Sequence, residues 1–483
     1  MQIFGAILRI FRLQPTIMAI DDATLDKILD RIDDQLPQAL ERLKAFLRIR
    51  SISTDPAFSD DCSSAADWLV NDLNEIGFDA RRHNTPGHPM VVAKSPQQND
   101  SGRSLLFYGH YDVQPVDPLE LWKRDPFDPV IEKHKGFDAL FARGAADDKG
   151  QLMTFVEACR CWKDIHGELP PNITLFFEGE EESGSPSLVP FMEDNKDLLK
   201  SDLALVCDTG MWNAETPAIS TMLRGMVGEE ITITGPSRDL HSGMYGGPAI
   251  NPIRVLTRIL GVLHDDNGSV QLPGFYEGVT ELPEKLARQW ESLEFSQSDF
   301  LSDVGLSVPA GEKGYSVLQQ IWSRPTCEIN GINGGYTGEG FKTVLPSQAV
   351  AKLSFRLVGE QDPDKISSAL YQWVEERLPE DCTVSFKSKD GSPATVMPID
   401  DPVFTQAADA LETEWQKPAV FAGCGGSIPV VGYFREILGT DSLLVGFGLD
   451  DDAIHSPNEK YNLSSYHKGT RSWARILQVI SAA

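Results

Sequence analysis

The sequence predicts an α/β protein with a mainly parallel sheet that is interrupted by a ferredoxin-like α+β domain. Three observations lead to this prediction. Short apolar runs typical of buried strands alternate with amphipathic helical segments up to residue 219. Between residues 220 and 392 the order changes to strand, helix, strand, strand, helix, strand, and after residue 393 the first pattern returns. We therefore expect one domain built from residues 1–219 and 393–483, split around a second at 220–392.

Length, composition and charge limit the classes to which the chain can belong. A chain of 483 residues is too long for one ordinary core, so two domains or a domain with an insertion are expected. With 41% hydrophobic and 24% charged residues, the composition is that of a globular protein. Asp and Glu number 71 against 43 Lys and Arg, and the net charge of -28 repels nucleic-acid phosphates. Nucleic acid is therefore not an expected partner.

The N-terminal stretch and the cysteines bear on the compartment of the protein. Residues 1–17 are mildly apolar and basic, but Arg9 and Arg12 interrupt them and no cleavage site of small residues follows. The apolar run is also shorter than the roughly 20 residues that span a bilayer, and Met18 is an alternative start. The cysteines are scattered, without a CxxC pair. We expect a cytoplasmic protein without a membrane partner.

Two amphipathic helices are expected in the first part of the chain. Apolar residues recur at helical spacing from residue 22 to residue 50, where Pro37 is expected to divide or restart the helix. A second helix is expected over residues 63–78, with Gly77 at the position of a left-handed cap. Both helices are interpreted as packing elements without a chemical role.

Three short apolar runs predict buried strands next to acids or a histidine. They are residues 104–109 before His110, residues 172–179 before Glu180, and residues 202–208 ending at Asp208. A helical pattern over residues 149–162 separates the first two, which predicts parallel strands connected by a helix. Ligands bind beyond the carboxyl ends of the strands in such sheets.

The segment from 220 to 392 has the pattern of a ferredoxin-like domain. Helices are expected to begin at Asn251-Pro252 and at Asp362-Pro363. The strand over residues 349–358 alternates, with apolar residues on one face and the other face free for a ligand. The irregular stretch from residue 265 to 319 is interpreted as an insertion in this domain. The α/β pattern then continues with a helix and a strand, at residues 401–415 and 442–448.

The acids and histidines that follow the apolar strands are the candidate site. His110 and Asp112 are two residues apart in an extended chain, so they lie on the same side and Asp112 can orient the His110 imidazole. Asp147 and Asp148 lie where a strand passes into a helix. An acid there suits a helix cap or, between two divalent cations, a bridging carboxylate.

A cluster of four carboxylates ends the second strand, at Glu178, Glu180, Glu181 and Glu182. Their repulsion needs compensation, which divalent cations provide, so that one Glu binds metal while its neighbour takes a proton from water. Asp208 ends the third strand in the same way, and His455 lies in a turn-rich stretch that can reach the same edge. Two histidines with three or four carboxylates form a ligand set suited to zinc, manganese or cobalt.

Six segments together resemble the carnosinase-type dipeptidases: GHYDVQP, RGAADDKG, EGEEESGS, CDTGMW, DLHSGMYGG and HSPNEKYN. That group belongs to the metallopeptidase family of aminoacylase, carboxypeptidase G and succinyl-diaminopimelate desuccinylase. The likeness extends from about Leu43 to the end, and the motifs come in the family's order. It implies a catalytic domain of the zinc-exopeptidase type, interrupted by a lid and dimerisation domain.

The resemblance implies a role for each residue of the metal centre. Asp147 would bridge two divalent metal ions, zinc, manganese or cobalt, and the remaining ligands would be His110 and Asp208 on one ion and Glu182 and His455 on the other. Glu181 would be the general base: a water between the ions loses a proton to it and attacks the amide carbon. Asp112 would steady His110. Relatives also have a cis peptide between the acids that match Asp147 and Asp148.

The resemblance also implies substrate contacts outside the metal centre. His241 is similar to the lid histidine that relatives insert into the site of the neighbouring subunit, where it steadies the oxyanion, so a homodimer is implied. Arg356 matches the arginine that binds the substrate carboxylate, and Thr343 and Ser427 resemble further substrate contacts. Cys424 is a departure, because carnosinase-like relatives usually have an acidic residue just before GGSIP. This departure weakens a claim about recognition of a free amino terminus.

The leading hypothesis is two-metal-dependent hydrolysis of the amide bond of dipeptides or other short peptides with a free carboxylate. The alternative is a deacylase or desuccinylase that uses the same residues on N-acylated amino acids. A non-catalytic metal-binding scaffold is less favoured, because Glu181 and every proposed ligand occur together. A serine hydrolase is disfavoured, since no serine lies in a GxSxG elbow after a convincing strand.

Overall fold

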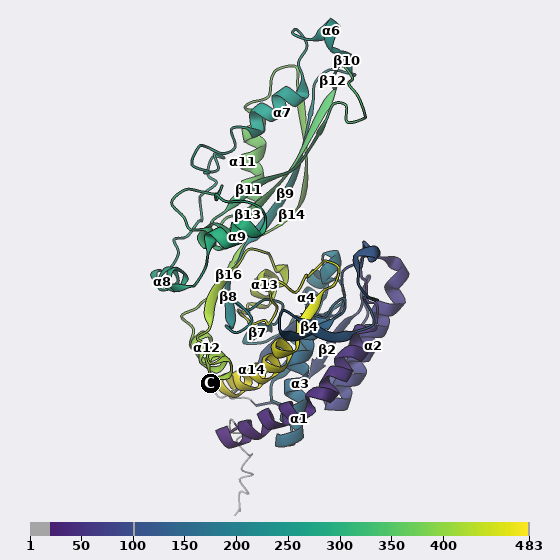
Figure 1. Ribbon diagram of the computed structural model, residues 1–483, viewed down its shortest axis with the longest axis vertical. Coiled ribbons are helices and arrows are strands. Elements are labelled where there is room, and N and C mark those ends of the chain that lie inside the picture. The colour runs from purple at the N-terminus through teal and green to yellow at the C-terminus, as the bar shows by residue number, and fades with distance from the viewer. Residues whose placement is uncertain (1–19, 100–101, 482–483) are drawn as a thin grey trace, which may run out of the picture.

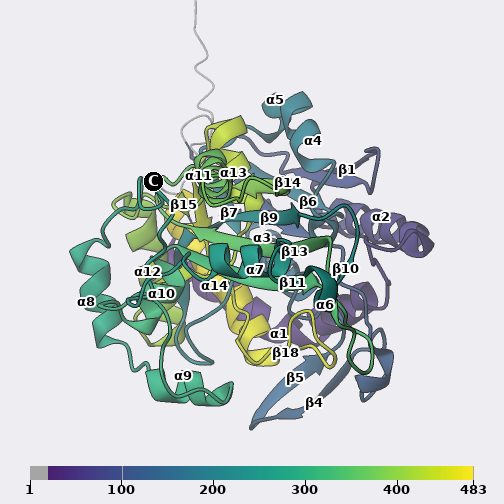
Figure 2. The same cartoon turned by 90° about the horizontal axis from the view of Figure 1, so that it is seen from above.

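The computed structural model describes residues 20–99 and 102–481. The N-terminal residues 1–17 and Met18, on which a leader and an alternative start were considered, lie outside the described residues. Figure 1 shows a larger body that contains both ends of the described chain and a smaller, elongated body that stands on it. Seen from above in Figure 2, the outline of the smaller body falls over that of the larger one. Within the described ranges, no helix combines the length and apolar character needed to cross a membrane.

A mixed sheet is the centre of the larger body. Within the described residues it has nine strands, in the order β1 (Asp79–His83), β2 (Met90–Lys94), β6 (Ile173–Glu178), β3 (Leu105–His110), β7 (Leu203–Val206), β17 (Ser442–Leu444), β8 (Ala218–Leu223) and β15 (Thr395–Val396), with β16 (Val420–Cys424) paired to β8. The central strands β6, β3, β7 and β17 run parallel, whereas β1, β2 and β15 pair antiparallel with their neighbours. The predicted α/β fold with a largely parallel sheet is therefore confirmed.

Helices cover both faces of this sheet, which explains why its central strands are apolar throughout. On β3, Phe107 stacks on Phe155 of α3 and meets Trp473 of α14, whereas the next residue, Tyr108, meets Phe434 on the opposite face. The first face carries α2 (Ser59–Ile76), α3 (Lys149–His166) and α14 (Leu463–Ser481), on which α1 (Asp22–Leu47) and α12 (Pro402–Trp415) pack in turn. The opposite face carries α4 (Leu188–Asp194), α5 (Lys196–Leu199), α13 (Pro429–Tyr433) and the π-turn η4 (Phe434–Leu438).

The two N-terminal helices follow the sequence pattern with one correction. Gly77 ends α2 in the left-handed conformation, with φ of 110°, as predicted. The prediction that Pro37 divides or restarts the first helix is wrong, because α1 runs without a break from Asp22 to Leu47. A proline costs a helix one hydrogen bond, but buried residues on both sides of Pro37, such as Ile32 and Leu43, pack into the same core. That packing keeps the two halves in one helix.

The smaller body has the predicted order of strands and helices. Its elements are β9 (Gly225–Thr234), α7 (Pro252–Leu260), β11 (Thr326–Gly334), β13 (Gln348–Leu357), α11 (Pro363–Glu375) and β14 (Thr383–Ser392). The antiparallel sheet order β11, β13, β9, β14 is that of a ferredoxin-like domain. Its core joins Phe355 of β13 to Leu256 of α7 and Leu370 of α11. The boundaries at 219/220 and 392/393 stay a prediction; β8 of the large sheet runs to Leu223 and β14 ends at Ser392.

The stretch from residue 265 to 319 differs from the prediction of an irregular insertion in the second domain. It contains α8 (Glu284–Ser292) and α9 (Gln297–Asp303), and α10 (Val317–Trp322) begins within it. Trp290 of α8 donates to the Phe421 carbonyl of β16 (2.7 Å), and the Gln289 side chain both donates to the Ala419 carbonyl and accepts from the Phe421 amide. These contacts occupy the edge of β16 that does not face β8. Part of the insertion therefore packs on the larger body, where the apolar side chains of Leu286 and Trp290 join its core.

A small antiparallel sheet lies beside the larger one. It consists of β4 (Val130–His134), β5 (Phe137–Phe141) and β18 (Lys460–Asn462), and the register places Lys460 opposite Phe141. The pairing of β18 with β5 brings the C-terminal segment that precedes Lys460 against the segment that follows Phe141. Both segments carry candidate site residues.

We expect Trp290→Ala to destabilise β16 and to leave the core of the smaller body intact. Trp290 is 5% exposed, and loss of a buried tryptophan costs about 3–5 kcal/mol. Hydrogen exchange followed by mass spectrometry should therefore show faster exchange in residues 420–424 than in the wild type, with no change in residues 348–357. Leu370→Ala, in the core of the smaller body, is the matched control and should give the opposite pattern. Equal loss of protection in both segments would contradict the packing described here.

Candidate metal centre

The candidate site lies at the carboxyl ends of the three central parallel strands. His110 is the last residue of β3 and pairs with Glu178, the last residue of β6, while Asp208 comes two residues after β7. Asp147 lies between β5 and α3, and the bond between Asp147 and Asp148 is a cis peptide, as the resemblance implied. Parallel pairing thus delivers residues that are far apart in sequence to one edge of the sheet.

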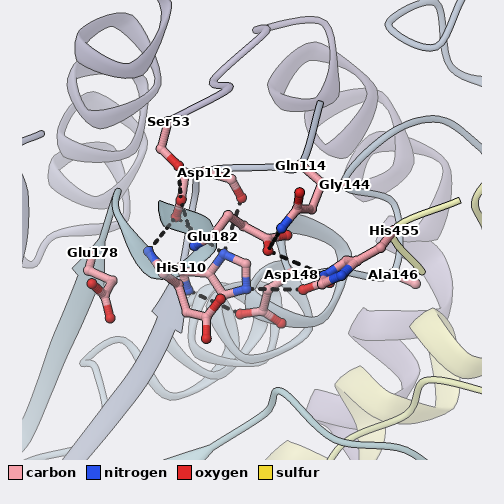
Figure 3. A network of polar contacts seen from close by, with 12 residues as sticks. Ser53, His110, Asp112, Gln114, Gly144, Ala146, Asp148, Glu178, Glu182 and His455 are labelled. Atoms are coloured by element: carbon pink, nitrogen blue, oxygen red, sulfur yellow. Dashed lines mark hydrogen bonds and ion pairs between the residues drawn. The ribbon is translucent and has the colours of Figure 1, made fainter. Parts of the chain in front are cut away.

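Two groups of side chains come close enough to hold a metal ion. One is His110, Asp147 and Asp208 and the other is Asp147, Glu182 and His455, and within each group the ligand atoms lie within 4.8 Å of one another. Asp147 belongs to both groups. Its Oδ1 is 3.1 Å from His110 Nε2 and its Oδ2 is 2.9 Å from His455 Nε2. One carboxylate therefore turns an oxygen toward each histidine, and Figure 3 shows His110, Glu182 and His455 turned toward one another.

The donor set and its burial fit divalent cations. Two imidazoles and three carboxylates match the mixed nitrogen and oxygen ligands of zinc, manganese or cobalt sites. Glu182 Oε1 is buried and has no hydrogen-bond partner among the described residues. A buried carboxylate oxygen without a donor is costly unless a cation is close. His110 is fully buried, whereas the His455 side chain is 53% exposed, so the centre opens to solvent on the His455 side.

The turn that carries His455 is closed by its own side chains and by the small sheet. His455 has a left-handed backbone, with φ of 60°, between residues that form no regular structure. Lys460, the first residue of β18, donates from Nζ to Asp451 (2.7 Å) and to Asp452 (2.6 Å), and its amide donates to the Asp452 carbonyl. These bonds fold residues 451–460 into a compact turn that presents His455 to Asp147.

Asp112 connects the His110 ring to the turn that holds the two adjacent glutamates. Asp112 Oδ1 is 3.3 Å from His110 Nδ1 and accepts a hydrogen bond from the Glu181 amide (3.2 Å). Its Oδ2 accepts from the Glu182 amide (3.0 Å) and from the Ser53 hydroxyl (2.6 Å). The structure thus places Asp112 behind His110 and ties Glu181 and Glu182, in the short helix η3 (Glu181–Ser183), to the same point.

Burial and nearby negative charges raise the pKa of two acids at the centre, Glu181 and Asp208, in the absence of a cation. Burial raises the pKa of Glu181 to about 8, and the negative charges of Asp208 and Glu182 add to the rise. Burial also raises the pKa of Asp208 to about 7, with a further contribution from Asp147. Ionisation of these two acids is therefore unfavourable here in the absence of a cation. A divalent cation would reverse these shifts, because positive charge favours the ionised acids.

The predictions from sequence did not include several residues that support the candidate ligands. Gln114 Nε2 donates to Glu182 Oε2 (2.6 Å), and Ser53 supports Asp112 from the segment after α1. Glu459, four residues after His455, is buried and bonded to the segment that leads to Asp147. Gln114 and Glu459 lie inside the quoted motifs GHYDVQP and HSPNEKYN, and that position is the signal that could have found them. Ser53 has no such signal.

The residues expected to contact substrate are divided between two places. Arg356 of β13 donates from Nη1 to the Ser427 hydroxyl (3.1 Å), and that hydroxyl donates to the Arg224 carbonyl (2.5 Å). Ser427 follows β16 of the larger body, so the first of these bonds connects the two bodies. His241 and Thr343 instead lie together at the far tip of the smaller body. His241 ends β10 (Leu240–His241), which pairs with β12 (Val344–Leu345), and Thr343, just before β12, accepts from the amide of Ser242, the first residue of α6 (Ser242–Tyr245). Within one chain, the structure does not bring this tip to the candidate metal ligands.

Comparison with known proteins identifies the family. The sequence is 31% identical to the Cys-Gly metallodipeptidase DUG1 of Candida albicans, over 95% of this chain and 98% of that protein. The structure of the dipeptidase Dug1p from Saccharomyces cerevisiae has a TM-score of 0.78 at 29% identity, covering 95% of this chain and 99% of that one. Human carnosine dipeptidase 1 has a TM-score of 0.79 at 26% identity, covering 96% and 100%. Residues 106–479 match the model of peptidase family M20/M25/M40. With this match over most of its length, the chain belongs to peptidase family M20/M25/M40, as its resemblance to the carnosinase-type dipeptidases implied.

Proposed function

We propose that the protein hydrolyses the amide bond of dipeptides or other short peptides that carry a free carboxylate. The observation that carries this proposal is the pair of ligand groups that share Asp147, with Glu181 beside them. Membership of the peptidase family and the likeness to a Cys-Gly metallodipeptidase over nearly the whole chain support it. A single carboxylate between two histidines is an arrangement that suits two metal ions at the short separation of two-metal sites.

In this proposal His110, Asp147 and Asp208 would hold one divalent ion, and Asp147, Glu182 and His455 would hold the other. Such ions, when bound, polarise a carbonyl oxygen and lower the pKa of water. Glu181 takes the proton from the attacking water and returns it to the leaving nitrogen, which is the work of a general base and then a general acid. Asp112 keeps the His110 ring in the orientation that turns Nε2 to the ligand side.

Arg356 and Ser427 are proposed to bind the substrate carboxylate. The Arg356 guanidinium is half-buried and makes no ion pair with a described residue, so its fork of donors is available to a carboxylate. His241 and Thr343 would complete the site of a second copy in a homodimer, with the smaller body acting as lid and dimerisation domain. Their place at the tip, away from the ligands of their own chain, agrees with this.

The seven cysteines form no disulfide, which supports the proposed cytoplasmic location.

Hydrolysis of N-acylated amino acids is the second candidate function. Cys424, at the end of β16, stands where an acidic residue usually precedes GGSIP in carnosinase-like relatives. A neutral thiol gives a substrate ammonium group no ionic partner, and an N-acyl substrate has no such group. Dipeptides and N-acetyl amino acids with the same C-terminal residue, assayed side by side, separate the two functions. A metal-binding scaffold would hydrolyse neither.

Glu181→Gln should reduce kcat by about 10²–10⁴-fold, because removal of a general base costs that much, with metal content unchanged. The assay is hydrolysis of dipeptides by enzyme reconstituted with zinc, manganese or cobalt, with metal content measured by mass spectrometry. Glu193→Gln, an exposed acid on α4, is the matched control and should be as active as the wild type. Full activity of the Glu181 variant would remove the general base from the proposal.

Metal removal should make thermal stability depend on pH. Without metal, the folded-state pKa values of about 7 for Asp208 and about 8 for Glu181 lie above the ordinary values of 3.8 and 4.5. A raised carboxyl pKa stabilises the fold below its ordinary value, and this contribution is lost as pH rises through the folded-state pKa. We expect the Tm of metal-depleted protein to fall by at least about 2 °C, equivalent to about 2 kcal/mol for a chain of this length, between about pH 5 and pH 8. Metal-loaded protein should change less, and a parallel fall in both forms would contradict the charge argument.

Arg356→Lys should raise KM for dipeptides by about 10–100-fold, since hydrogen bonds to a charged group are worth about 1.5–3 kcal/mol. Lysine keeps the charge but lacks the fork that binds a carboxylate at two points. Steady-state kinetics with a dipeptide and with its C-terminal amide measure the effect. The variant should discriminate between the two less than the wild type does. An unchanged preference for the free carboxylate would show that another residue binds it.

A further inference from the structure

Glu459 is a buried acid to which the proposed reaction gives no role. It is 0% exposed, and its carboxylate accepts four hydrogen bonds. Oε2 accepts from Arg143 Nη1 (2.7 Å) and from the Gly144 amide (3.0 Å). Oε1 accepts from the Ala146 amide (2.9 Å) and from the Asp147 amide (3.1 Å). All four donors belong to the segment of five residues that ends at the shared ligand.

The pairing of β18 with β5 explains why Glu459 meets this segment. Lys460 pairs with Phe141, and the ladder continues by one bond from the Ala142 amide to the Glu459 carbonyl (3.2 Å). After Ala142 the segment leaves the strand and passes through Gly144, with φ of 81°. A Cβ at Gly144 would lie 2.6 Å from Val113 Cγ1, so only glycine fits. The backbone amides of Gly144, Ala146 and Asp147 therefore do not pair with a neighbouring strand. They donate to the Glu459 carboxylate instead.

Arg143 extends the same contact to the loop that follows His110. Its guanidinium is 1% exposed, donates to the Pro115 carbonyl (3.0 Å) and lies 5.3 Å from the centre of the Trp122 ring. The Arg143–Glu459 pair therefore connects three segments, each of which carries a metal-ligand candidate: the one after His110, the one before Asp147 and the one after His455. Removal of one partner of a buried ion pair leaves the other charge and the amides without partners.

We propose that Glu459 is a positioning residue that holds the Asp147 carboxylate between the two metal sites. The inference rests on the proposed two-metal centre. Asp147 would have to turn one oxygen to each ion, so a small rotation of its backbone would displace a ligand oxygen from both sites at once. The Glu459 carboxylate fixes that backbone through the Ala146 and Asp147 amides, and the rigid Arg143 contact fixes the carboxylate in turn. Loss of Glu459 should therefore weaken metal binding even though Glu459 is not a ligand.

Glu459→Gln tests the proposal because it keeps the shape of the side chain and replaces one acceptor oxygen by a donor. Metal-depleted protein is titrated with Mn²⁺ or Co²⁺, and bound metal per chain is measured by equilibrium dialysis and mass spectrometry. We expect the affinity to fall by about 10–100-fold, as is common when a group that supports a ligand is lost, with fewer than two ions bound at a metal concentration that saturates the wild type. The absorption spectrum of the Co²⁺ form, which reports ligand geometry, should also change.

Glu157→Gln is the matched control. Glu157 is also buried, at 1% exposure, and its carboxylate accepts two hydrogen bonds from Arg42 (2.7 and 2.5 Å), between α1 and α3 and away from the metal centre. This variant should lose thermal stability but bind two ions with wild-type affinity. The comparison separates a general loss of stability from an effect on the centre.

Glu459→Asp covers the case in which Glu459→Gln does not fold. It keeps the charge for Arg143 but is one methylene shorter, so the carboxylate withdraws from the Ala146 and Asp147 amides. It should fold and bind metal more weakly than the wild type. Wild-type metal affinity in either Glu459 variant would overturn the positioning role while leaving the proposed function intact. A wild-type protein that fails to bind two ions would instead overturn the proposed two-metal centre itself.

Discussion

Parallel pairing of β3 with both β6 and β7 is the constraint on which the candidate centre depends. A parallel ladder aligns the carboxyl ends of its strands. His110, Asp208 and the acids that follow Glu178 therefore reach one edge of the sheet, although about 100 residues of chain separate His110 from Asp208. The strands are buried on both faces, and their aromatic residues lock them to α3 and α14 on one side and to η4 on the other. The rigidity of the edge comes from that packing.

The centre brings several acids together in a buried place, where their ionisation is unfavourable. Glu181 and Asp208 are acids whose pKa values burial moves to about 8 and about 7, and each lies close to other acids. Such an arrangement costs stability in the absence of cations, and a divalent cation would favour the ionised acids. Two further acids, Asp112 and Glu459, accept hydrogen bonds from the backbone amides of segments that carry candidate ligands. Acidic side chains outside the candidate ligand set therefore fix the backbone of candidate ligands such as Asp147 and Glu182.

The division into two bodies gives the centre a second set of contacts. Arg356 and Ser427 meet where the bodies join, so any movement between them would change the position of the guanidinium relative to the ligands. The apolar residues of α8 pack on the larger body. Because α8 belongs to the segment that leads to β11 of the smaller body, this contact restricts movement between the two bodies. His241 and Thr343 lie at the opposite end of the smaller body, away from the candidate ligands of their own chain. The geometry of one chain therefore agrees with the proposed homodimer.

The sequence by itself determined the α/β class, the strands before His110, Glu180 and Asp208, the ferredoxin-like order and the metal-ligand candidates, because these follow from local periodicity and from motifs. Tertiary structure decided what depends on contacts between distant segments. It kept α1 continuous through Pro37, because packing on both sides of the proline outweighs one lost hydrogen bond. It placed Trp290 on β16 of the larger body, and it bonded Glu459 to residues 143–147 through the pairing of β18 with β5. A sequence pattern records which faces are apolar, but not which distant surface each face will cover, and for that reason these features were visible only in the folded chain.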